Sequence, residues 1–217
     1  MPTSRSYGDA CAIARALDVV GERWALLVVR ELLLGPLRFS GLRHALPGAS
    51  SNLVADRLRE LEGRGVIDRR KLPAPASSRV YELTAWGRDL ESILLALGDW
   101  GSHVPLPPAP TTLSATSVVL FLRSSARPDP EAPPATYRLE LGDRVWTIRT
   151  EAGRLQVQPG EPASPDASLR ADPATLNALL AAPREFDAAV ADGSVVAAGD
   201  LPALRRLVQA VTAPAPV

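Results

Sequence analysis

The sequence has very little cysteine or histidine, and this scarcity excludes several kinds of site. Of the 217 residues, one is a cysteine, Cys11, and two are histidines, His44 and His103. A single cysteine cannot form an intramolecular disulfide or a multi-cysteine zinc site. With only two histidines, the chain offers few zinc ligands and few candidates for the base of a Ser-His-Asp triad. A Gly-rich phosphate loop and a nucleophile elbow are missing too, so the sequence predicts a protein that is not an enzyme and has no metal or cofactor.

Long apolar runs and a signal-peptide pattern are also missing. No apolar stretch reaches the roughly 18 residues that a membrane span needs, and residues 1–10 lack the charged-then-apolar layout of a secretory signal. The expectation is therefore a cytoplasmic protein with no membrane partner. Hydrophobic residues make up 46% of the chain and charged residues 22%, which is ordinary for globular domains, so the chain is expected to fold.

Neither sign of charge is in excess, which at first argues against nucleic acid as a partner. The 24 basic and 24 acidic side chains cancel over the whole chain. The two halves differ only weakly, with a net charge of +2 over residues 1–104 and −2 over residues 105–217. DNA binding needs a basic surface only at the contact elements, so the local pattern has to decide.

A proline-rich stretch divides the chain. Residues 104–112 (VPLPPAPTT) contain four prolines and no charge, which predicts a semi-rigid linker. The predicted domains are therefore residues 1–104 and 113–217, joined by a linker at 105–112. A second proline-rich stretch, residues 126–135, lies inside the later half and is expected to be a loop. The fold class expected for the whole chain is α+β.

The first half has the order of elements of a winged helix-turn-helix. Apolar residues recur at spacings of three and four, which predicts helices. Pro47-Gly48 predicts a tight turn, after which Ser50, Ser51 and Asn52 offer N-cap side chains to a helix that ends at Gly63. The predicted helices cover residues 9–20, 22–34, 39–46, 50–63 and 85–101, and a wing hairpin has β-prone runs at 66–72 and 79–83 with its tip at 73–78.

Polar and basic side chains gather on the elements that would face DNA. A helix fits the major groove, and basic ribbons lie along phosphates. Asp56, Glu60 and Glu62 weaken the later turns of the fourth helix electrostatically, so base contacts are expected at its N-terminal end. The alternative for each arginine is an ordinary solvated surface charge. The candidate DNA-binding residues are Arg38, Arg43, Ser50, Ser51, Asn52, Arg57, Arg69, Arg70, Lys71 and Arg79.

The second half alternates in the manner of strands before it turns helical. Strands are predicted at 117–123, 136–141, 144–150 and 154–158, with a hairpin turn at 141–144. Asp172-Pro173 is an N-cap followed by proline at the first helical position, which predicts the start of a helix. A short helical turn at 187–191, a last strand at 195–198 and a final helix at 200–211 complete an α+β half.

A series of separate motifs covers nearly the whole first half. Its residues are Cys11-Ala12-Ile13, Gly21-Glu22-Arg23-Trp24, Leu32-Leu33, Arg38-Phe39-Ser40-Gly41-Leu42, Leu58-Arg59-Glu60-Leu61, Gly65-Val66-Ile67, Tyr81-Glu82-Leu83-Thr84, Gly87 and Trp100. In this order they resemble the HxlR family of bacterial winged-helix regulators. The sequence departs from the family pattern at Gly41 and Arg23, where glutamate and lysine are frequent.

The resemblance implies a homodimer that binds double-stranded DNA at a palindromic operator. The first and last helices of the domain would pack across the two-fold axis. The last predicted helix has an apolar face that would suit this contact, although the same face could instead belong to a core within the domain. The resemblance also makes Cys11 a candidate redox sensor. The alternative for Cys11 is a small buried residue in a helix, with Asp9 nearby to raise its pKa.

About fifty residues of the second half carry a second series of motifs, at residues 168–173, 176–180, 186–189, 193–196, 199–200 and 204–207. They resemble the C-terminal portion of sterol carrier protein type 2 domains, and the strands before them fit the same family only loosely. The resemblance implies a sheet and helices that enclose a tunnel for lipid-like molecules. The alternative is a closed core that the same side chains fill. The candidate ligand-binding residues are Phe121, Tyr137, Trp146, Leu179 and Phe186.

Together these inferences predict a DNA-binding transcriptional regulator, a homodimeric repressor whose second domain senses a hydrophobic small molecule. Such a ligand would have to bind the two conformations of the regulator unequally. An alternative second domain is a dimerisation or partner-binding module without a ligand. An alternative for the whole protein is a lipid or drug sequestration protein whose winged helix mediates protein contacts.

Overall fold

The computed structural model describes residues 6–72, 78–105 and 112–211. The chain divides into two compact units, Met1–Val104 and Pro105–Val217, which we call unit 1 and unit 2. Most of the predicted hairpin tip and of the predicted linker lies outside the described residues. In the three described ranges, no helix has the length and apolar character to cross a membrane.

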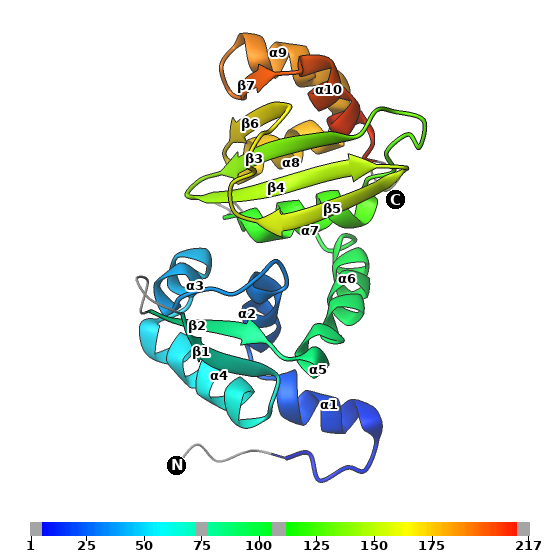
Figure 1. Ribbon diagram of the computed structural model, residues 1–217. Helices are drawn as coiled ribbons and strands as arrows, with labels where there is room; N and C mark the ends of the chain where they lie inside the picture. The colour runs from blue at the N-terminus through cyan, green and yellow to red at the C-terminus, as the bar shows by residue number, and fades with distance from the viewer. Residues whose placement is uncertain (1–5, 73–77, 106–111, 212–217) are drawn as a thin grey trace. The chain divides into compact units, whose positions relative to one another are not determined.

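Unit 1 is a winged helix-turn-helix, as predicted (Figure 1). Helices α3 and α4 are joined by the short turn that contains Pro47-Gly48, and the strands β1 and β2 pair in antiparallel register to form the wing. The elements are α1 (Ala12–Val20), α2 (Ala25–Leu32), α3 (Phe39–Ala45), α4 (Ser51–Gly63), β1 (Ile67–Lys71), β2 (Arg79–Leu83), α5 (Ala85–Arg88) and α6 (Leu90–Gly101).

The helix cap predicted at Ser50 has the expected geometry, and one predicted helix is divided. The Ser50 hydroxyl accepts the backbone N–H of Leu53 at 3.2 Å and begins α4. The Thr84 hydroxyl accepts the N–H of Gly87 at 2.9 Å and begins α5. The helix predicted over 85–101 is interrupted at Asp89, whose N–H bonds to the carbonyl of Trp86 in a tighter turn.

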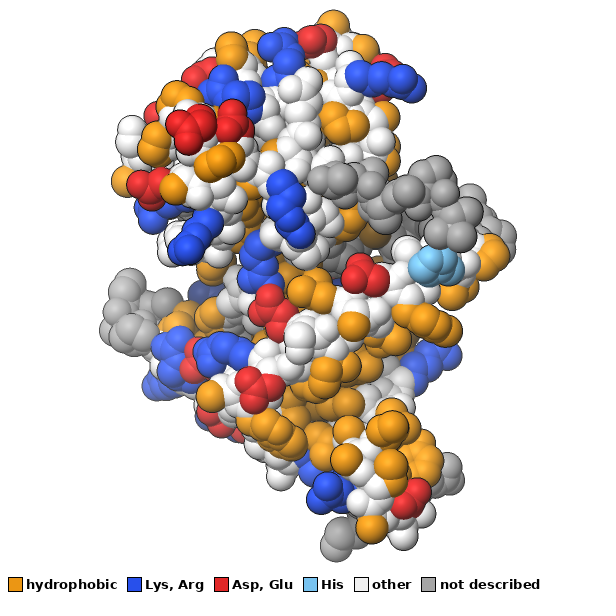
Figure 2. Space-filling view, turned by 90° about the vertical axis from the view of Figure 1, so that its right-hand side faces the viewer, with side chains coloured by type: hydrophobic (Ala, Val, Ile, Leu, Met, Phe, Trp, Pro, Cys, Tyr) orange, Lys and Arg blue, Asp and Glu red, His pale blue; other side chains and the backbone are white. Residues whose placement is uncertain are grey.

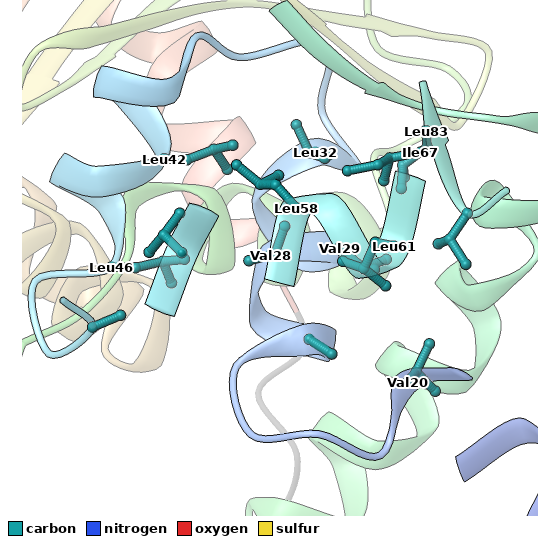
Figure 3. Close-up of a cluster of buried hydrophobic side chains, with 14 residues drawn as sticks. Val20, Val28, Val29, Leu32, Leu42, Leu46, Leu58, Leu61, Ile67 and Leu83 are labelled. Atoms are coloured by element: carbon teal, nitrogen blue, oxygen red, sulfur yellow. The ribbon is translucent and has the colours of Figure 1, made fainter. Parts of the chain in front are cut away.

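A single apolar core positions α4 (Figure 3). The inner face of α4 is buried against α2, and α3 and the base of the wing close the same cluster. Because every inward position of these helices is filled, α4 has one favourable rotation about its axis. The side chains labelled in the close-up are Val20, Val28, Val29, Leu32, Leu42, Leu46, Leu58, Leu61, Ile67 and Leu83.

Unit 2 is an α+β domain with a five-stranded sheet in the order β5-β4-β3-β6-β7. The β3–β6 pair is parallel and the other pairs are antiparallel. One face of β3 and β4 is apolar, and α7, α8 and α10 lie against it (Figure 1). The elements are α7 (Ala115–Ser125), β3 (Ala135–Leu141), β4 (Arg144–Glu151), β5 (Arg154–Pro159), β6 (Ala167–Ala171), α8 (Pro173–Ala181), a 3-10 turn (Pro183–Glu185), α9 (Phe186–Ala191), β7 (Val196–Gly199) and α10 (Leu201–Gln209).

The strand predicted over 117–123 is wrong, because this segment belongs to α7. Ser114 caps the helix by accepting the N–H of Ser117 at 3.4 Å. The consecutive apolar residues at 118–120 fit a buried strand as well as a buried helix by periodicity, and here they are buried on α7, which packs against α8 and β5. No strand was predicted at β6 (Ala167–Ala171), which the structure adds to the sheet.

Gly87 joins the wing to the helices that follow it. A Cβ atom at this position would lie 2.0 Å from the carbonyl oxygen of Val66, which is backbone and cannot rotate away. Gly63, on α4, has open space around the same position.

We therefore expect Gly87→Ala to lower the stability of unit 1 by about 1–3 kcal/mol or more through overpacking. The control, Gly63→Ala, should be neutral or slightly stabilising, because alanine favours helices over glycine by up to about 1 kcal/mol. Calorimetric unfolding of the full chain measures both. Equal transition temperatures for Gly87→Ala and the unsubstituted chain would contradict the expected clash with the carbonyl oxygen of Val66.

Candidate nucleic-acid interface

The first turn of α4 presents the polar residues that the sequence singled out. Ser51 and Asn52 are exposed, and Ser50 caps the helix. Val54, Leu58 and Leu61 are buried on the opposite side and hold this orientation. The N-terminus of a helix of this length attracts phosphate, because its dipole and its free N–H groups point outward.

The two arginines near α3 have different surroundings. Arg43 is half-buried, and its Nη1 donates to the carbonyl oxygen of Ala49 at 2.6 Å. It therefore stabilises the turn between α3 and α4. Arg38, at the N-cap of α3, is exposed and has no ion pair within the described ranges. Of the two, Arg38 has the free guanidinium.

The second turn of α4 carries charges that are already paired. The side chain of Arg57 is only 11% exposed, and its Nη1 lies 2.5 Å from Glu60 Oε2 and 3.5 Å from Glu22 Oε2. Arg59 is exposed and pairs with Asp56. The structure therefore places Arg57 against two carboxylates and does not bring it to the exposed surface of Ser51 and Asn52.

The wing separates its cations onto two faces. Directly opposite residues share a face of a hairpin, and the register pairs Lys71 with Arg79 and Arg69 with Tyr81. These three cations, Arg69, Lys71 and Arg79, form what we call the basic ribbon face. Arg69 lies 3.9 Å from Glu62, whereas Lys71 and Arg79 have no ion pair among the residues that the structure describes. Like charges directly opposite each other repel and are unfavourable. An anionic partner would therefore offset the repulsion between Lys71 and Arg79.

Arg70 lies on the other face of the hairpin and is neutralised. Its Nε and Nη2 donate to the two carboxylate oxygens of Glu82 at 2.8 and 3.1 Å. These hydrogen bonds lower the pKa of Glu82 and raise the pKa of Arg70. The pair therefore stays charged at neutral pH and contributes little net field.

Backbone and hydroxyl bonds attach the wing to the rest of unit 1. The Thr84 hydroxyl donates to the carbonyl of Gly65 at 2.8 Å. Leu37 and Tyr81 exchange two backbone hydrogen bonds of 3.0 and 2.8 Å, so the segment before α3 is joined to β2 by an isolated antiparallel bridge. The basic ribbon face and the N-terminus of α4 are thereby held in one body.

Most of the predicted ligand-binding residues of unit 2 fill its core. Trp146, Leu179 and Phe186 are buried, and Phe121 is half-buried on α7. Tyr137 alone of the five lines a described cavity, of about 270 Å³, together with Thr150 and Arg206. Sequence reasoning missed the last two, because alternation along a strand and amphipathicity along a helix do not reveal an unfilled space.

Cys11 lies outside α1. The alternative predicted for it, a buried residue within a helix whose pKa is raised by Asp9, is wrong on both points. Cys11 occupies the N-cap position and is exposed. The nearby backbone N–H groups of Ala14 and Ile13, at the start of α1, lower the pKa of its thiol, although the thiol makes no capping hydrogen bond. Asp9 instead accepts the backbone N–H of Cys11 at 2.8 Å. A redox role for this thiol stays a prediction.

Cys11 should therefore react faster at low pH than an ordinary thiol. We expect the rate of alkylation by iodoacetamide to rise with a midpoint below about 8.5, the value for free cysteine. The single cysteine makes the signal unambiguous, and Cys11→Ser provides the blank. A midpoint at or above that of glutathione, measured in parallel, would count against the N-cap geometry.

Comparisons with known proteins match each unit separately. Residues 19–106 match the HxlR-like helix-turn-helix family, and residues 121–212 match the SCP-2 sterol transfer family. The HTH-type transcriptional regulator sll1512 of Synechocystis sp. is 39% identical over 95 residues, which cover 44% of this chain and 70% of that protein. YvaP, an HTH-type transcriptional regulator of Bacillus subtilis, is 38% identical over 89 residues, which cover 41% of this chain and 82% of that protein. A solved structure of the redox regulator HypR in its oxidized form shares 30% identity at a TM-score of 0.42, covering 45% of this chain and all of that chain.

Proposed function

The chain belongs to the HxlR-like helix-turn-helix family of transcriptional regulators, and from this premise we propose that it is a homodimeric repressor of a palindromic operator. Unit 1 is the DNA-binding and dimerisation domain in this proposal, and unit 2 is the ligand-binding domain. The observation that carries the proposal is the basic ribbon face, where Lys71 and Arg79 lie opposite each other without a partner carboxylate among the described residues.

The contacts with DNA divide between reading and positioning. The first turn of α4 enters the major groove, where Ser51 and Asn52 meet base edges and the helix N-terminus meets phosphate. The basic ribbon face follows the sugar-phosphate backbone, and Arg38 contacts a phosphate beside α3. Arg43 and Arg57 support these elements from within, because their guanidinium groups are held by Ala49 and Glu60.

The dimer interface in this proposal is the apolar surface of α1, α5 and α6. No residue of α6 is buried in the single chain, and Trp100 is 70% exposed. Figure 2 shows hydrophobic side chains gathered over this part of unit 1. Exposed apolar patches of this kind mark interaction sites. The exposed members are Ile13, Leu17, Trp86, Ile93, Leu97 and Trp100.

A second copy of the chain is the occupant that fits this surface. A groove of about 420 Å³ lies between α1 and the start of α6, with Val19, Trp86 and Ile93 in its walls. A two-fold axis pairs the same patch with itself and sets two copies of α4 about one DNA turn apart, or a multiple of it. The operator is then palindromic.

Unit 2 supplies the regulation in this proposal. Its match to the SCP-2 sterol transfer family and its cavity support a hydrophobic small molecule as the effector. Such a ligand changes operator affinity only to the extent that it binds the free and DNA-bound conformations unequally.

The basic ribbon face can be tested through the salt dependence of DNA binding. We expect the double variant Lys71→Ala, Arg79→Ala to bind more weakly and to lower the slope of log K against log salt by about 0.9 for each phosphate that is no longer neutralised. Arg59→Ala is the control, because Arg59 is exposed but already pairs with Asp56. Fluorescence anisotropy on a genomic fragment recovered by the purified chain gives the slope. An unchanged slope in the double variant would place the DNA elsewhere.

The dimer can be tested by charge insertion. Ile93→Glu with Trp100→Glu should convert the dimer to a monomer, since two buried carboxylates cannot be paired in an apolar interface. Val196→Glu, at an exposed apolar position of β7 in unit 2, is the matched control. Sedimentation velocity reads the mass directly, and a wild-type chain that sediments as a monomer at micromolar concentration would defeat the proposal.

A further inference from the structure

The cavity of unit 2 is small and has an unusual mixture of polar groups. It measures about 270 Å³ and lies between α10, the ends of β3 and β4, and the segment from Arg127 to Pro133. This volume is below the 300–1,000 Å³ typical of sites for drug-sized ligands. The enclosed part of this cavity therefore suits a molecule smaller than a sterol.

Two buried hydroxyl groups in this cavity have only long hydrogen bonds. Tyr137 is 3% exposed and Thr150 is 8% exposed. The Tyr137 hydroxyl donates to the carbonyl of Ala203 at 3.3 Å, and the Thr150 hydroxyl donates to Tyr137 at 3.5 Å. Hydroxyl bonds are ordinarily about 2.7–2.8 Å. Buried polar groups so weakly bonded gain free energy when a ligand offers a closer partner.

The Tyr137 hydroxyl stays protonated and keeps its ability to donate. Burial raises its pKa above the ordinary value, while the nearby positive charge of Arg206 acts in the opposite direction. Arg206 lines the same cavity as this hydroxyl.

Two opposite charges line the cavity without forming an ion pair with each other. Arg206, on α10, and Glu151, at the end of β4, have no ion pair within the described ranges. The other two charged groups of the lining have partners. Arg127 Nη1 donates to the carbonyls of Ser124 and Ala126 at 2.7 and 2.8 Å, and Asp129 accepts the N–H of Glu131 at 2.9 Å.

We propose that this cavity binds a small apolar amino acid, with its carboxylate at Arg206 and the Tyr137 hydroxyl and its ammonium group at Glu151. The apolar side chain of the ligand lies against Leu207. The inference rests on the proposed role of unit 2 as a ligand-binding domain, and it replaces a wholly hydrophobic effector with a zwitterion whose side chain is apolar.

A zwitterion suits this cavity better than a ligand with one charge. A fatty acid would pair with Arg206 but bring its carboxylate toward Glu151, and an alkyl ammonium ion would meet the reverse conflict. A molecule with both charges gives each of these two exposed groups an oppositely charged partner at once.

Isothermal titration calorimetry of the full chain tests the assignment. The probes are valine, leucine, isoleucine, methionine and phenylalanine, with 4-methylpentanoate and 3-methylbutylamine as the singly charged counterparts of leucine. We expect at least one amino acid to bind. We expect 4-methylpentanoate and 3-methylbutylamine each to bind about tenfold more weakly than leucine or worse, because each lacks one of the two hydrogen-bonded charges. Arg206→Gln and Glu151→Gln should each cause a loss of the same size.

Arg205→Gln is the matched control, because Arg205 is the neighbour of Arg206 on α10 but pairs with Asp187 and does not line the cavity. It should leave binding unchanged. Circular dichroism verifies that the exposed substitutions leave the fold intact.

Binding by none of the five amino acids overturns the inference, and so does equal binding of a singly charged counterpart. Neither result affects the proposed binding of DNA by unit 1. If an amino acid binds as expected but operator affinity does not change, the ligand assignment stands and ligand-dependent regulation fails.

Discussion

The burial of one side of α4 is the constraint on which the rest of unit 1 depends. Val54, Leu58 and Leu61 belong to the same cluster of buried side chains as Val28 and Val29 of α2. A helix fixed in rotation in this way must present its remaining positions to solvent, and Ser51 and Asn52 are among them. The apolar packing on the buried side of α4 thus determines which polar residues its exposed side presents.

The sequence was sufficient for the parts of the fold that depend on local chemistry. Ser50 and Thr84 are recognisable caps because the hydroxyl and its donor lie three residues apart, and Gly142 marks the hairpin between β3 and β4 for a similarly local reason. The segment 117–123 failed because its apolar run satisfies both periodicities, and only its packing against α8 and β5 makes it a helix.

The candidate site was predictable as a set of residues but not as a set of free charges. The sequence reveals that arginines cluster around α3, α4 and the wing, yet two of them have acceptors that are distant in sequence. Arg70 pairs with Glu82 across the hairpin, and Arg57, which pairs with Glu60 on its own helix, also lies 3.5 Å from Glu22 before α2. Periodicity cannot show such distant pairings, and it cannot show that Cys11 occupies the exposed N-cap position just outside its helix.

The joint at Thr84 and Gly87 has a mechanical consequence. The Thr84 hydroxyl holds the carbonyls of Gly65 and Val66, and the missing side chain of Gly87 lets the two backbones touch. The end of α4 and the start of α5 are therefore attached to each other through the residues at the base of the wing. A partner subunit that displaced α5 would displace the start of β1 with it, so contacts at the dimer interface and contacts of the wing are mechanically coupled.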